Sequence, residues 1–380
     1  MRIVQITTDN RNQLRDYEKS EPYFGTAPAG LLDGFEGMLG VEVHVISCTS
    51  TRMHVPEMIG SNIWFHQPYV PKLGWGRSLF LGCAWTVKRL LQRLKPDIVH
   101  GQGTERDCAM TAVLSGFPNI LTLHGNMRIH AKRPENSGNI YYKLAAGLET
   151  YCLKRTDGVV AISNYTREIV EGFAKKTWLL PNAVDKRFFE VVVDPQRIPR
   201  ILFVGSLDER KNPIGLIKAC EPLLRAGACR IAFAGVGDPQ SAYRKEFDSL
   251  LTTTPGLEQL GFLGRDQLAA EFAKSSILVL PTFEDNCPMV ILEAMAAGLP
   301  VAASRVGGVP DLIRHEADGL MFNPHDPLDI RKTVERLVEN PGLGETMAAE
   351  ARKKAFHEFH PREIAIRHVE FYREILRDKS

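Results

Sequence analysis

The clearest structural signal in the sequence is VLPTFEDNCPMVILEAMAAG at residues 279–298. An apolar run ends in an acidic loop, and a helical segment with Pro288 near its beginning follows that loop. Proline suits the first position of a helix, so either Asn286 or Cys287 is predicted to cap it. The stretch therefore predicts a strand, a loop and a helix whose first backbone amides face a ligand, and such amides bind phosphate.

Glu293 lies inside this predicted helix, on a face that is otherwise apolar. A carboxylate in such surroundings needs a polar partner. Two interpretations are open. In the first, Glu293 is structural, and backbone amides or an arginine donate hydrogen bonds to its carboxylate. In the second, the carboxylate accepts hydrogen bonds from sugar hydroxyls. The candidate site in this stretch also includes Asp285 in the loop and Met289 and Val290 in the first turn.

The same alternation of strand and helix continues along the chain of 380 residues. Short runs rich in Val, Ile and Leu are separated by segments with helical periodicity, which is typical of parallel sheets covered by helices. Strands are predicted at residues 2–7, 42–47, 63–66, 97–100, 119–124, 158–162, 177–180, 200–204, 230–234, 258–262, 277–280, 300–303 and 319–322.

Residues 181–199 interrupt this alternation with three prolines and no regular period, as a linker does. We therefore expect an α/β protein with two doubly wound, Rossmann-like domains, at residues 1–182 and 183–360. Ligands bind such sheets at the carboxyl ends of the strands, so the expected site is a cleft between the domains. Residues 361–378 have the apolar spacing of an amphipathic helix, which we expect to pack back on the first domain.

The composition is that of an ordinary globular protein, with 44% hydrophobic and 24% charged residues. The chain has 47 Lys and Arg against 45 Asp and Glu. Its net charge of +2 therefore lacks the excess of positive charge that is typical of a nucleic-acid-binding protein. Seven cysteines without a CxxC motif indicate neither a disulfide framework nor a zinc site, and fit a reducing compartment. The sequence shows no signal peptide and no run of the ~20 apolar residues that span a bilayer. We expect a cytoplasmic protein that at most rests on a membrane.

A second phosphate site is predicted where the strand at residues 200–204 leads to Asn212 and Pro213, again a cap followed by a proline. Arg210 and Lys211 precede this helix, and two cations beside a helix N-terminus would neutralise a diphosphate. A solvated pair of charges on a turn is the alternative.

A third loop contains Gly307 and Gly308 after a strand, where the absence of side chains lets the backbone approach a ligand. A pair of glycines in a turn is common. This loop is therefore a candidate only in combination with the stretches that contain Lys211 and Asp285.

In their order, these motifs resemble those of the retaining glycosyltransferases of glycosyltransferase family four, which have the GT-B fold. The resemblance covers nearly the whole chain. In that family a Glu, seven residues and a second Glu lead into AMAxGxPV, and residues 284–301, EDNCPMVILEAMAAGLPV, match this pattern. Glu293 is the second acid and Asp285 stands in the place of the first. The resemblance implies that Glu293 binds the nucleotide ribose and Asp285 the donor sugar.

The family's phosphate-binding pattern, a Gly-Arg turn followed by a lysine, corresponds to GSLDERKN at residues 205–212. Lys211 matches the lysine, and Ser206 replaces the arginine. Arg210 is the candidate substitute for the missing charge.

The resemblance also implies an active-site histidine, which LTLHGN places at His124. A single histidine is more often structural, but its position at the end of a strand favours the active-site role. The family's glycine-rich loop after the first strand has its best counterpart at residues 25–27, which include Gly25 and Thr26. The departure from the family pattern is greatest there.

The chemistry that follows is transfer of a sugar, with UDP-hexose the donor that the resemblance implies. Lys211, Arg210 and helix-end amides can stabilise the departing diphosphate. The chain contains no DxD motif, so we expect no metal ion and no other cofactor. The resemblance implies a retained anomeric configuration and a glycan or lipid-linked acceptor. A role in cell-surface polysaccharide or glycolipid synthesis is the family's commonest use.

Two basic clusters of the first domain are candidate contacts for an anionic acceptor, although solvated loop charges explain them equally well. They contain Arg11, Arg15 and Lys19, and Arg128, His130, Lys132 and Arg133. A third group has the pattern of a basic amphipathic helix at a membrane surface, for which a core stripe is the alternative. It contains Trp75, Leu79, Phe80, Leu81 and Trp85, followed by Lys88, Arg89 and Arg93.

Other classes fit the sequence less well. A dinucleotide-dependent oxidoreductase needs GxGxxG directly after a strand, and no such motif or GxxxxGK[ST] loop is present. A GT-B epimerase or phosphorylase is a closer rival. Product analysis separates these enzymes from a transferase, because only a transferase needs a glycan acceptor. Lys211, Glu293 and His124 together argue against a binding protein without catalysis.

Overall fold

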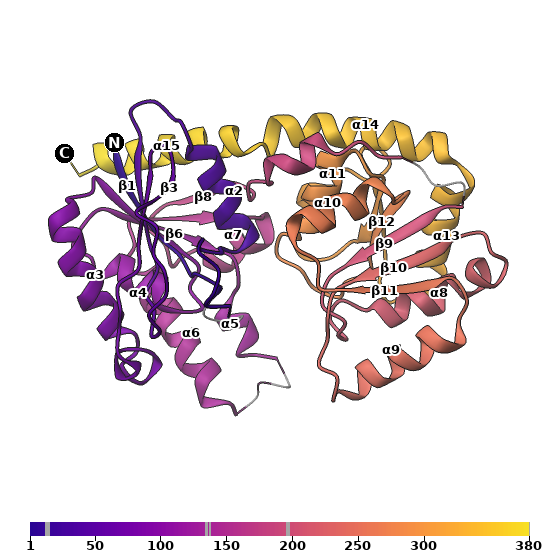
Figure 1. Cartoon of the computed structure of the whole chain (residues 1–380), viewed down its shortest axis with the longest axis horizontal. Coiled ribbons are helices and arrows are strands. Elements are labelled where there is room, and N and C mark those ends of the chain that lie inside the picture. Colours follow the sequence, from indigo (N-terminus) through magenta and orange to yellow (C-terminus); the bar gives the residue numbers. More distant parts are fainter. Residues whose placement is uncertain (12–15, 134–135, 137, 195–197, 380) are drawn as a thin grey trace. The chain divides into compact units, whose positions relative to one another are not determined.

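The computed structural model describes residues 1–11, 16–133, 136, 138–194 and 198–379. The chain forms two compact units, Met1–Ala183 with Pro361–Ser380, and Val184–His360. The first unit is therefore built from two separate parts of the chain. Each unit has an α/β sheet with helices on both faces (Figure 1).

The first unit has an eight-stranded sheet in the order β3-β4-β2-β1-β5-β6-β7-β8. All its pairs are parallel except β3 with β4. The strands are β1 (Arg2–Ile6), β2 (Glu42–Ile46), β3 (Met58–Gly60), β4 (Ile63–His66), β5 (Ile98–Gln102), β6 (Asn119–Leu123), β7 (Gly158–Ala161) and β8 (Thr177–Leu179).

Helices cover both faces of this sheet and enclose two apolar clusters. One face carries α2 (Thr26–Phe35) and α15 (Pro361–Arg377). The other carries α3 (Leu81–Leu94), α4 (Asp107–Val113), α6 (Ile140–Leu153) and α7 (Asn164–Val170), and a short α5 (Met127–His130) precedes α6.

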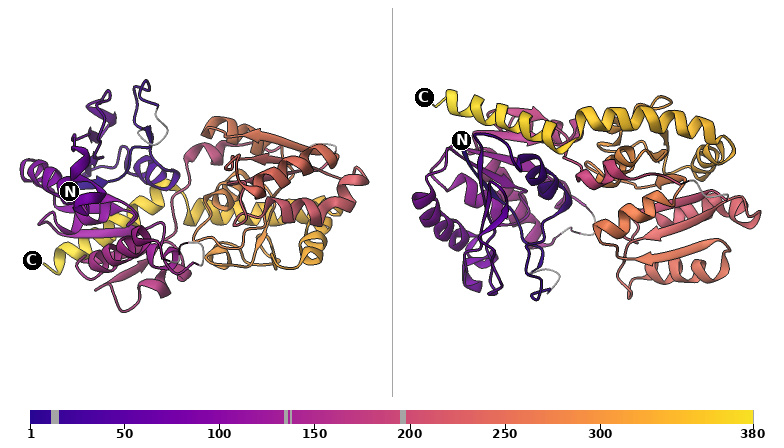
Figure 2. Two further views of the ribbon diagram at one scale, coloured as in Figure 1. Left: turned by 90° about the horizontal axis from the view of Figure 1, so that it is seen from below. Right: turned by 45° about the horizontal axis from the view of Figure 1, so that its top comes forward.

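The C-terminal helix is an integral part of the first unit. In Figure 2 it is the yellow helix next to the C-terminus, and it lies beside the indigo and purple elements. A Cβ atom on Gly34 of α2 would lie 2.1 Å from the carbonyl oxygen of Pro361, so glycine is needed for this close packing. Trp178 stacks on Phe371 with ring centroids 4.8 Å apart, and its indole nitrogen donates to Glu374 at 3.0 Å.

The second unit has a fully parallel six-stranded sheet in the order β11-β10-β9-β12-β13-β14, and a large apolar cluster packs against it. Its strands are β9 (Arg200–Val204), β10 (Arg230–Ala234), β11 (Leu257–Gly261), β12 (Ile277–Leu280), β13 (Val301–Ser304) and β14 (Leu320–Phe322). Its helices are α8 (Pro213–Arg225), α9 (Ala242–Thr253), α10 (Arg265–Ala273), α11 (Met289–Ala297), α12 (Val309–Leu312), α13 (Pro327–Glu339) and α14 (Pro341–Glu358).

All thirteen predicted strands are present within one or two residues of their expected bounds, which confirms the two doubly wound sheets. The short β3 was not predicted, because its residues lack the alternation of a half-buried strand. The predicted helix at residues 361–378 is α15, within the first unit.

Two local predictions were wrong. Pro288 is the N-cap of α11 with an extended ψ of 107°, so the helix begins at Met289, and neither Asn286 nor Cys287 caps it. The basic amphipathic helix does not start near Trp75, because Leu79 and Phe80 have positive φ angles of 52° and 64°. Two 3₁₀ turns, Lys72–Gly74 and Gly76–Ser78, precede α3 instead.

Candidate active site

Both sheets reverse their strand order beside the first strand of the unit, between β1 and β5 and between β9 and β12. Loops at such a reversal leave a crevice at the carboxyl ends of the strands, which is where doubly wound sheets bind ligands. In the second unit, the loop after β9 carries Lys211 and the loop after β12 carries Asp285. The two sequence stretches that predicted a phosphate site therefore meet at the reversal.

Lys211 and Asp285 form an ion pair between these loops, and their side chains are only 13% and 14% exposed. The backbone nitrogen of Lys211 donates to the carboxylate of Asp208 at 2.9 Å. The hydroxyl of Ser206 donates to the same carboxylate at 2.6 Å. Asp208 thus orders the loop on which Lys211 lies, and the Ser206 hydroxyl is committed to that loop.

Arg210 joins the two loops through three hydrogen bonds at its backbone and side chain. Its guanidinium donates to the carbonyl of Glu284 at 3.1 Å, and its own carbonyl accepts from the backbone nitrogen of Phe283 at 2.8 Å and from the hydroxyl of Thr282 at 3.1 Å. Arg210 therefore contributes to the shape of the site, in addition to its charge.

The helix after Lys211 begins as the sequence predicted. Asn212 is the N-cap of α8, with φ of 57°, and its side chain accepts from the backbone nitrogen of Gly215 at 3.1 Å. Pro213 occupies the first helical position. The positive end of the α8 dipole lies next to Lys211, so two sources of positive potential act on the same place.

Gly307 has a different role from the one expected. With φ of 53°, a Cβ atom there would lie 2.0 Å from the carbonyl oxygen of Asp285. The next residue, Gly308, donates its backbone N–H to that oxygen at 3.0 Å. The close approach that requires glycine is therefore to the backbone of Asp285, and it fixes the loop that carries the carboxylate.

Glu293 lies in α11 and is only 4% exposed. Among the described residues, none hydrogen bonds to its carboxylate, and Arg265 interacts with it through its charge. Burial raises the pKa of Glu293 to about 7, against the opposing effect of the Arg265 charge. A buried carboxyl with a perturbed pKa is a frequent feature of functional sites.

The remaining candidates of this stretch surround the same loop. Asn286 and Cys287 follow Asp285, with Asn286 half-buried and Cys287 buried. Met289 and Val290 form the first turn of α11, and Val290 is buried. In the sequence, these four residues lie between Asp285 of the ion pair and Glu293.

In the first unit, His124 directly follows β6, and its Nε2 lies 2.9 Å from Oε1 of Gln102 at the end of β5. Burial lowers the pKa of His124 to about 4, so the imidazole is neutral at pH 7. A small cavity beside it is also lined by Thr122, Asn182 and His368.

The glycine-containing loop of the sequence analysis ends close to this cavity. Gly25 is the N-cap of α2 and Thr26 its first residue, and Ala27 in the next position lines the cavity with His124. Sequence reasoning did not find Gln102, because a glutamine in a buried strand carries no motif.

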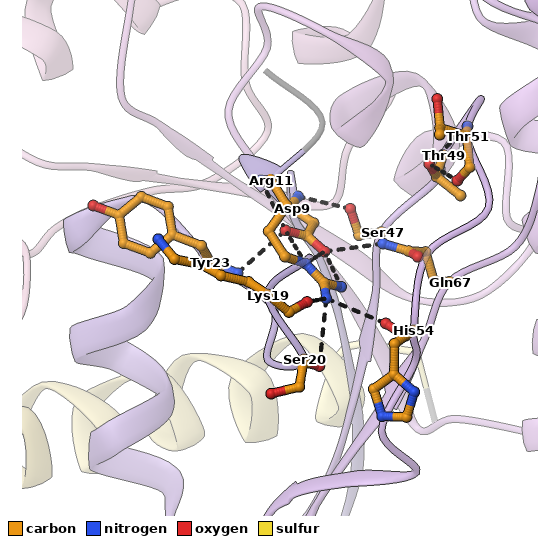
Figure 3. A network of polar contacts seen from close by, with 10 residues as sticks. All are labelled: Asp9, Arg11, Lys19, Ser20, Tyr23, Ser47, Thr49, Thr51, His54 and Gln67. Atoms are coloured by element: carbon orange, nitrogen blue, oxygen red, sulfur yellow. Dashed lines mark hydrogen bonds and ion pairs between the residues drawn. The ribbon is translucent and has the colours of Figure 1, made fainter. Parts of the chain in front are cut away.

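One member of the first basic cluster, Arg11, has a structural role. Arg11 is fully buried and pairs with Asp9 at 2.6 Å (Figure 3). Its guanidinium also donates to the carbonyls of Lys19 and His54, which ties the loop after β1 to the loop after β2. Arg15 lies outside the described residues, and Lys19 pairs with Asp16 at 2.8 Å. The expected patch of acceptor-binding cations is wrong for Arg11.

The second cluster is partly structural as well. Arg128 pairs with the buried Glu149 at 3.1 Å and donates to the carbonyl of Ile169 at 2.7 Å. His130 ends α5, and Lys132 and Arg133 follow it in the next turn.

Three potential metal ligands come together that the sequence analysis did not connect. The sulfur atoms of Cys48 and Cys83 and a carboxylate oxygen of Asp107 all lie within 4.8 Å of one another. Hydrogen bonding and burial raise the pKa of the Cys48 thiol, and burial raises that of the Asp107 carboxyl. Ionisation of these two groups, which binding of a cation requires, is therefore less favourable than at the protein surface.

The two units have the GT-B architecture, and solved structures share it over the whole chain. Sucrose-phosphate synthase from Thermosynechococcus elongatus superposes with a TM-score of 0.75 over 100% of both chains, at 19% identity. HepE from Anabaena, solved in complex with UDP-glucose, gives 0.73 over 98% of this chain and 100% of that one, at 17% identity. At these identities the likeness concerns the fold.

Family models match both units. Glycosyltransferase family 4 matches residues 31–188, and glycosyl transferases group 1 matches residues 198–340. The chain belongs to this family of glycosyltransferases and is a hexosyltransferase that uses a nucleotide-sugar donor. Among its relatives, the sulfoquinovosyl transferase SQD2 of Arabidopsis thaliana is 31% identical over 83% of this chain and 64% of that protein.

Among the described residues, no helix combines the length and the apolar character that a bilayer crossing needs.

Proposed function

We propose that this enzyme transfers a hexose from UDP-hexose to a glycan or lipid-linked acceptor, with retention of the anomeric configuration and without a metal ion. The observation that carries the proposal is the pairing of Lys211 with Asp285 at the strand-order reversal of the second sheet. A cation and a carboxylate on adjoining loops suit the two ends of a nucleotide-sugar, the diphosphate and the sugar hydroxyls.

The leaving group of the reaction is the diphosphate of UDP. The Lys211 ammonium and the N-terminal amides of α8 both carry positive potential, so they stabilise the charge that develops as the bond from C1 to phosphate oxygen breaks. Because the protein supplies this charge, the reaction proceeds without a cation, in accord with the absence of a DxD motif.

The donor is held at both ends in this proposal. The Glu293 carboxylate accepts hydrogen bonds from the ribose hydroxyls, and the Asp285 carboxylate accepts them from the sugar. UDP as the nucleotide is supported by the Anabaena protein, whose structure contains UDP-glucose. The family resemblance supports an active-site role for His124 of the first unit.

Retention follows from attack on the same face as the leaving group. The acceptor oxygen bonds to C1, the bond from C1 to phosphate oxygen breaks, and the acceptor proton passes to the departing phosphate. This step needs no nucleophile from the protein, and the family resemblance supports it. Such an enzyme would build cell-surface polysaccharide or glycolipid.

Calorimetry with UDP, GDP, ADP and NAD, in the presence of EDTA, tests the donor site. We expect UDP to bind the wild type, and Glu293→Ala to bind it much more weakly with the fold intact, as circular dichroism measures. Binding of NAD alone would contradict the proposal and favour an oxidoreductase. NMR of the product formed from UDP-glucose then shows which anomer the enzyme makes. Interconversion of the donor without an acceptor would indicate an epimerase. A reaction that requires phosphate would indicate a phosphorylase.

We also propose that the enzyme rests on an anionic membrane through α3 and the turns before it. Residues 58–96 contain six Lys and Arg and no Asp or Glu, although the whole chain is nearly neutral. Leu73, Leu81 and Trp85 are 70%, 53% and 59% exposed, so they do not belong to the core. Exposed apolar groups among cations fit the interface of an anionic bilayer, as on a cytoplasmic leaflet.

The membrane proposal is tested by sedimentation with phosphatidylglycerol vesicles and with phosphatidylcholine vesicles. We expect binding to the anionic vesicles only, and loss of that binding in Lys88→Glu with Arg93→Glu. The matched control is Lys245→Glu with Lys332→Glu, which makes the same change of charge at exposed sites of the second unit. Equal loss in both double variants would show a general charge effect and contradict this surface.

A further inference from the structure

Two thiols and a carboxyl group converge inside the first unit. The sulfur atoms of Cys48 and Cys83 and a carboxylate oxygen of Asp107 all lie within 4.8 Å of one another. Cys48 lies in the loop after β2, Cys83 in the first turn of α3, and Asp107 is the first residue of α4. Because the three groups come from different elements, no spacing in the sequence connects them.

The distances suit a metal ion with sulfur ligands. Three atoms within 4.8 Å of one another have a common centre at most about 2.8 Å from each, and Zn²⁺ bonds sulfur at about 2.3 Å and carboxylate oxygen at about 2.0–2.2 Å. Movements of less than about 1 Å therefore bring all three atoms to bonding distance. A tetrahedral ion with these three ligands keeps one position for a water molecule.

Tight packing of the backbone holds Cys83. A Cβ atom on the preceding residue, Gly82, would collide with the Cα atom of Gly74, so the first turn of α3 lies directly on the turn before it. The sulfur of Cys83 also lies 3.7 Å from the carbonyl oxygen of Gly74, and its side chain is fully buried. The direction of this thiol is therefore set by the fold before any ion binds.

Backbone hydrogen bonds hold the loop that carries Cys48. The next residue, Thr49, donates its backbone N–H to the carbonyl of Pro68 at 3.1 Å, and its own carbonyl accepts from the backbone nitrogen of Val70 at 2.8 Å. Cys48 is only half-buried, unlike the other two ligands. An ion can therefore enter the cluster from the side of Cys48.

Asp107 is a buried carboxyl group that needs a cation. It is 4% exposed, its side chain hydrogen bonds to the Cys48 thiol, and Arg106 acts on it through its charge. Among the residues that the structure describes, no Lys, Arg or His forms an ion pair with Asp107. Buried carboxylates are usually paired with a cation or bind a metal, and a thiol is a weak donor in place of either.

A bound ion would change the protonation of the cluster. Without a cation, burial opposes ionisation of Cys48 and Asp107. A divalent ion is the largest charge in its surroundings, and a thiol that coordinates it loses its proton outright. Each of the two thiols thus releases a proton to water as its sulfur binds the ion. Two sulfur ligands favour Zn²⁺ over Mg²⁺ and Ca²⁺, which prefer oxygen.

We propose that Cys48, Cys83 and Asp107 bind one Zn²⁺ ion, which joins the loop after β2 to the first turns of α3 and α4. The role of this ion is structural. The site belongs wholly to the first unit, whereas the charges proposed to stabilise the leaving diphosphate belong to the second. The inference is therefore independent of the proposed function, and hexose transfer does not use this ion.

Co²⁺ is the probe for the site, because its visible and ultraviolet absorption reports tetrahedral coordination and bonds to thiolates. The full-length protein is kept reduced, freed of metal with EDTA, transferred to buffer without EDTA and titrated with Co²⁺. We expect thiolate charge-transfer bands that saturate at one equivalent and disappear when Zn²⁺ is added. A wild type that develops no such bands would overturn the proposal.

Variants of the ligands test the assignment. Cys48→Ser and Cys83→Ser should each weaken Zn²⁺ binding more than about 100-fold, because even residues that only support a metal ligand contribute 10- to 100-fold. Asp107→Asn keeps the shape of the side chain and should also weaken binding. The matched control is Cys152→Ser, which changes a buried free cysteine of the same unit and should bind Zn²⁺ as the wild type does. Thiolate bands that persist when Cys48→Ser and Cys83→Ser are combined would overturn the assignment.

Urea unfolding tests the structural role. An ion that binds only the folded state stabilises it, so Zn²⁺ should raise the urea midpoint of the wild type and of Cys152→Ser. The midpoint of the double variant Cys48→Ser with Cys83→Ser should not respond, and circular dichroism shows whether this variant is folded. A wild type whose midpoint does not respond to Zn²⁺ would overturn the structural role, even if the double variant fails to fold. A protein that binds Zn²⁺ but transfers no hexose from UDP-hexose would overturn the proposed function and leave this site standing.

Discussion

Lys211 and Asp285, 74 positions apart in the sequence, pair with each other at the strand-order reversal of the second sheet. Both side chains are largely buried, and each is anchored at its backbone, Lys211 by Asp208 and Asp285 by Gly308. The pair is therefore a fixed feature of the site and differs from the mobile ion pairs of the surface.

Lys211→Ala should weaken UDP binding about 10- to 100-fold, because a hydrogen bond from a charged donor to a phosphate contributes about 1.5–3 kcal/mol. Calorimetry measures the change. Lys218→Ala is the control, since Lys218 lies in α8 but pairs with Glu246 at the exposed surface. Equal losses in the two variants would contradict a specific role for Lys211.

Glu293 should give the donor affinity a pH dependence. Its pKa of about 7 means that the carboxylate, the form proposed to accept hydrogen bonds from the ribose hydroxyls, becomes populated as the pH rises through 7. UDP-glucose binding should therefore strengthen between about pH 6 and pH 8. In Glu293→Gln this rise should be absent, and its persistence there would assign it to another group.

Glu293 should also make the free energy of unfolding fall as the pH rises, whereas donor binding strengthens. The folded pKa of about 7 exceeds the ordinary value of 4.5, so the unfolded chain loses its proton first and stability falls as the pH rises between these values. The loss is of order 3 kcal/mol at 1.36 kcal/mol per pKa unit. Urea unfolding should show Glu293→Gln to be more stable than the wild type at pH 8, with a smaller difference at pH 4.5.

The buried pair of Arg11 with Asp9 should be important for the stability of the first unit. Asp9→Ala leaves the Arg11 guanidinium buried without its carboxylate, and removal of one partner from a buried pair costs about 3–5 kcal/mol. Urea unfolding measures this cost. Asp16→Ala breaks the exposed pair with Lys19 and should cost less than about 1 kcal/mol. A similar small cost for Asp9→Ala would contradict the structural role.

Removal of metal ions should leave hexose transfer intact, because Lys211 and the N-terminus of α8 provide the positive charge that the leaving diphosphate needs. The rate is compared before and after dialysis against EDTA. Activity that disappears and returns with Mg²⁺ or Mn²⁺ would contradict this prediction.

The sheets could be predicted because buried parallel strands are continuous apolar runs, visible in a single sequence. The loops at the strand-order reversal were predictable from caps and prolines, as the start of α8 at Pro213 shows. The start of α11 was wrong by one residue, since Pro288 suits both the cap and the first turn. Local sequence does not separate these two positions.

Long-range polar contacts could not be predicted. Arg11 was expected at the surface because arginine is rarely buried, and its burial depends on carbonyls of two loops that no pattern connects. Gln5 and Tyr372 are 367 positions apart, and neither belongs to a motif. Contacts of this kind therefore appear only once the fold is known.

The packing of α15 on α2 also affects the order in which the two units can complete their folding. The first unit needs Pro361–Arg377 for its core, and these residues leave the ribosome after all of the second unit. During synthesis, the second unit can be complete while the first still exposes the apolar face of α2 to solvent. Newly made chains are therefore most open to chaperones and proteases at their N-terminal half, until the final helix closes it.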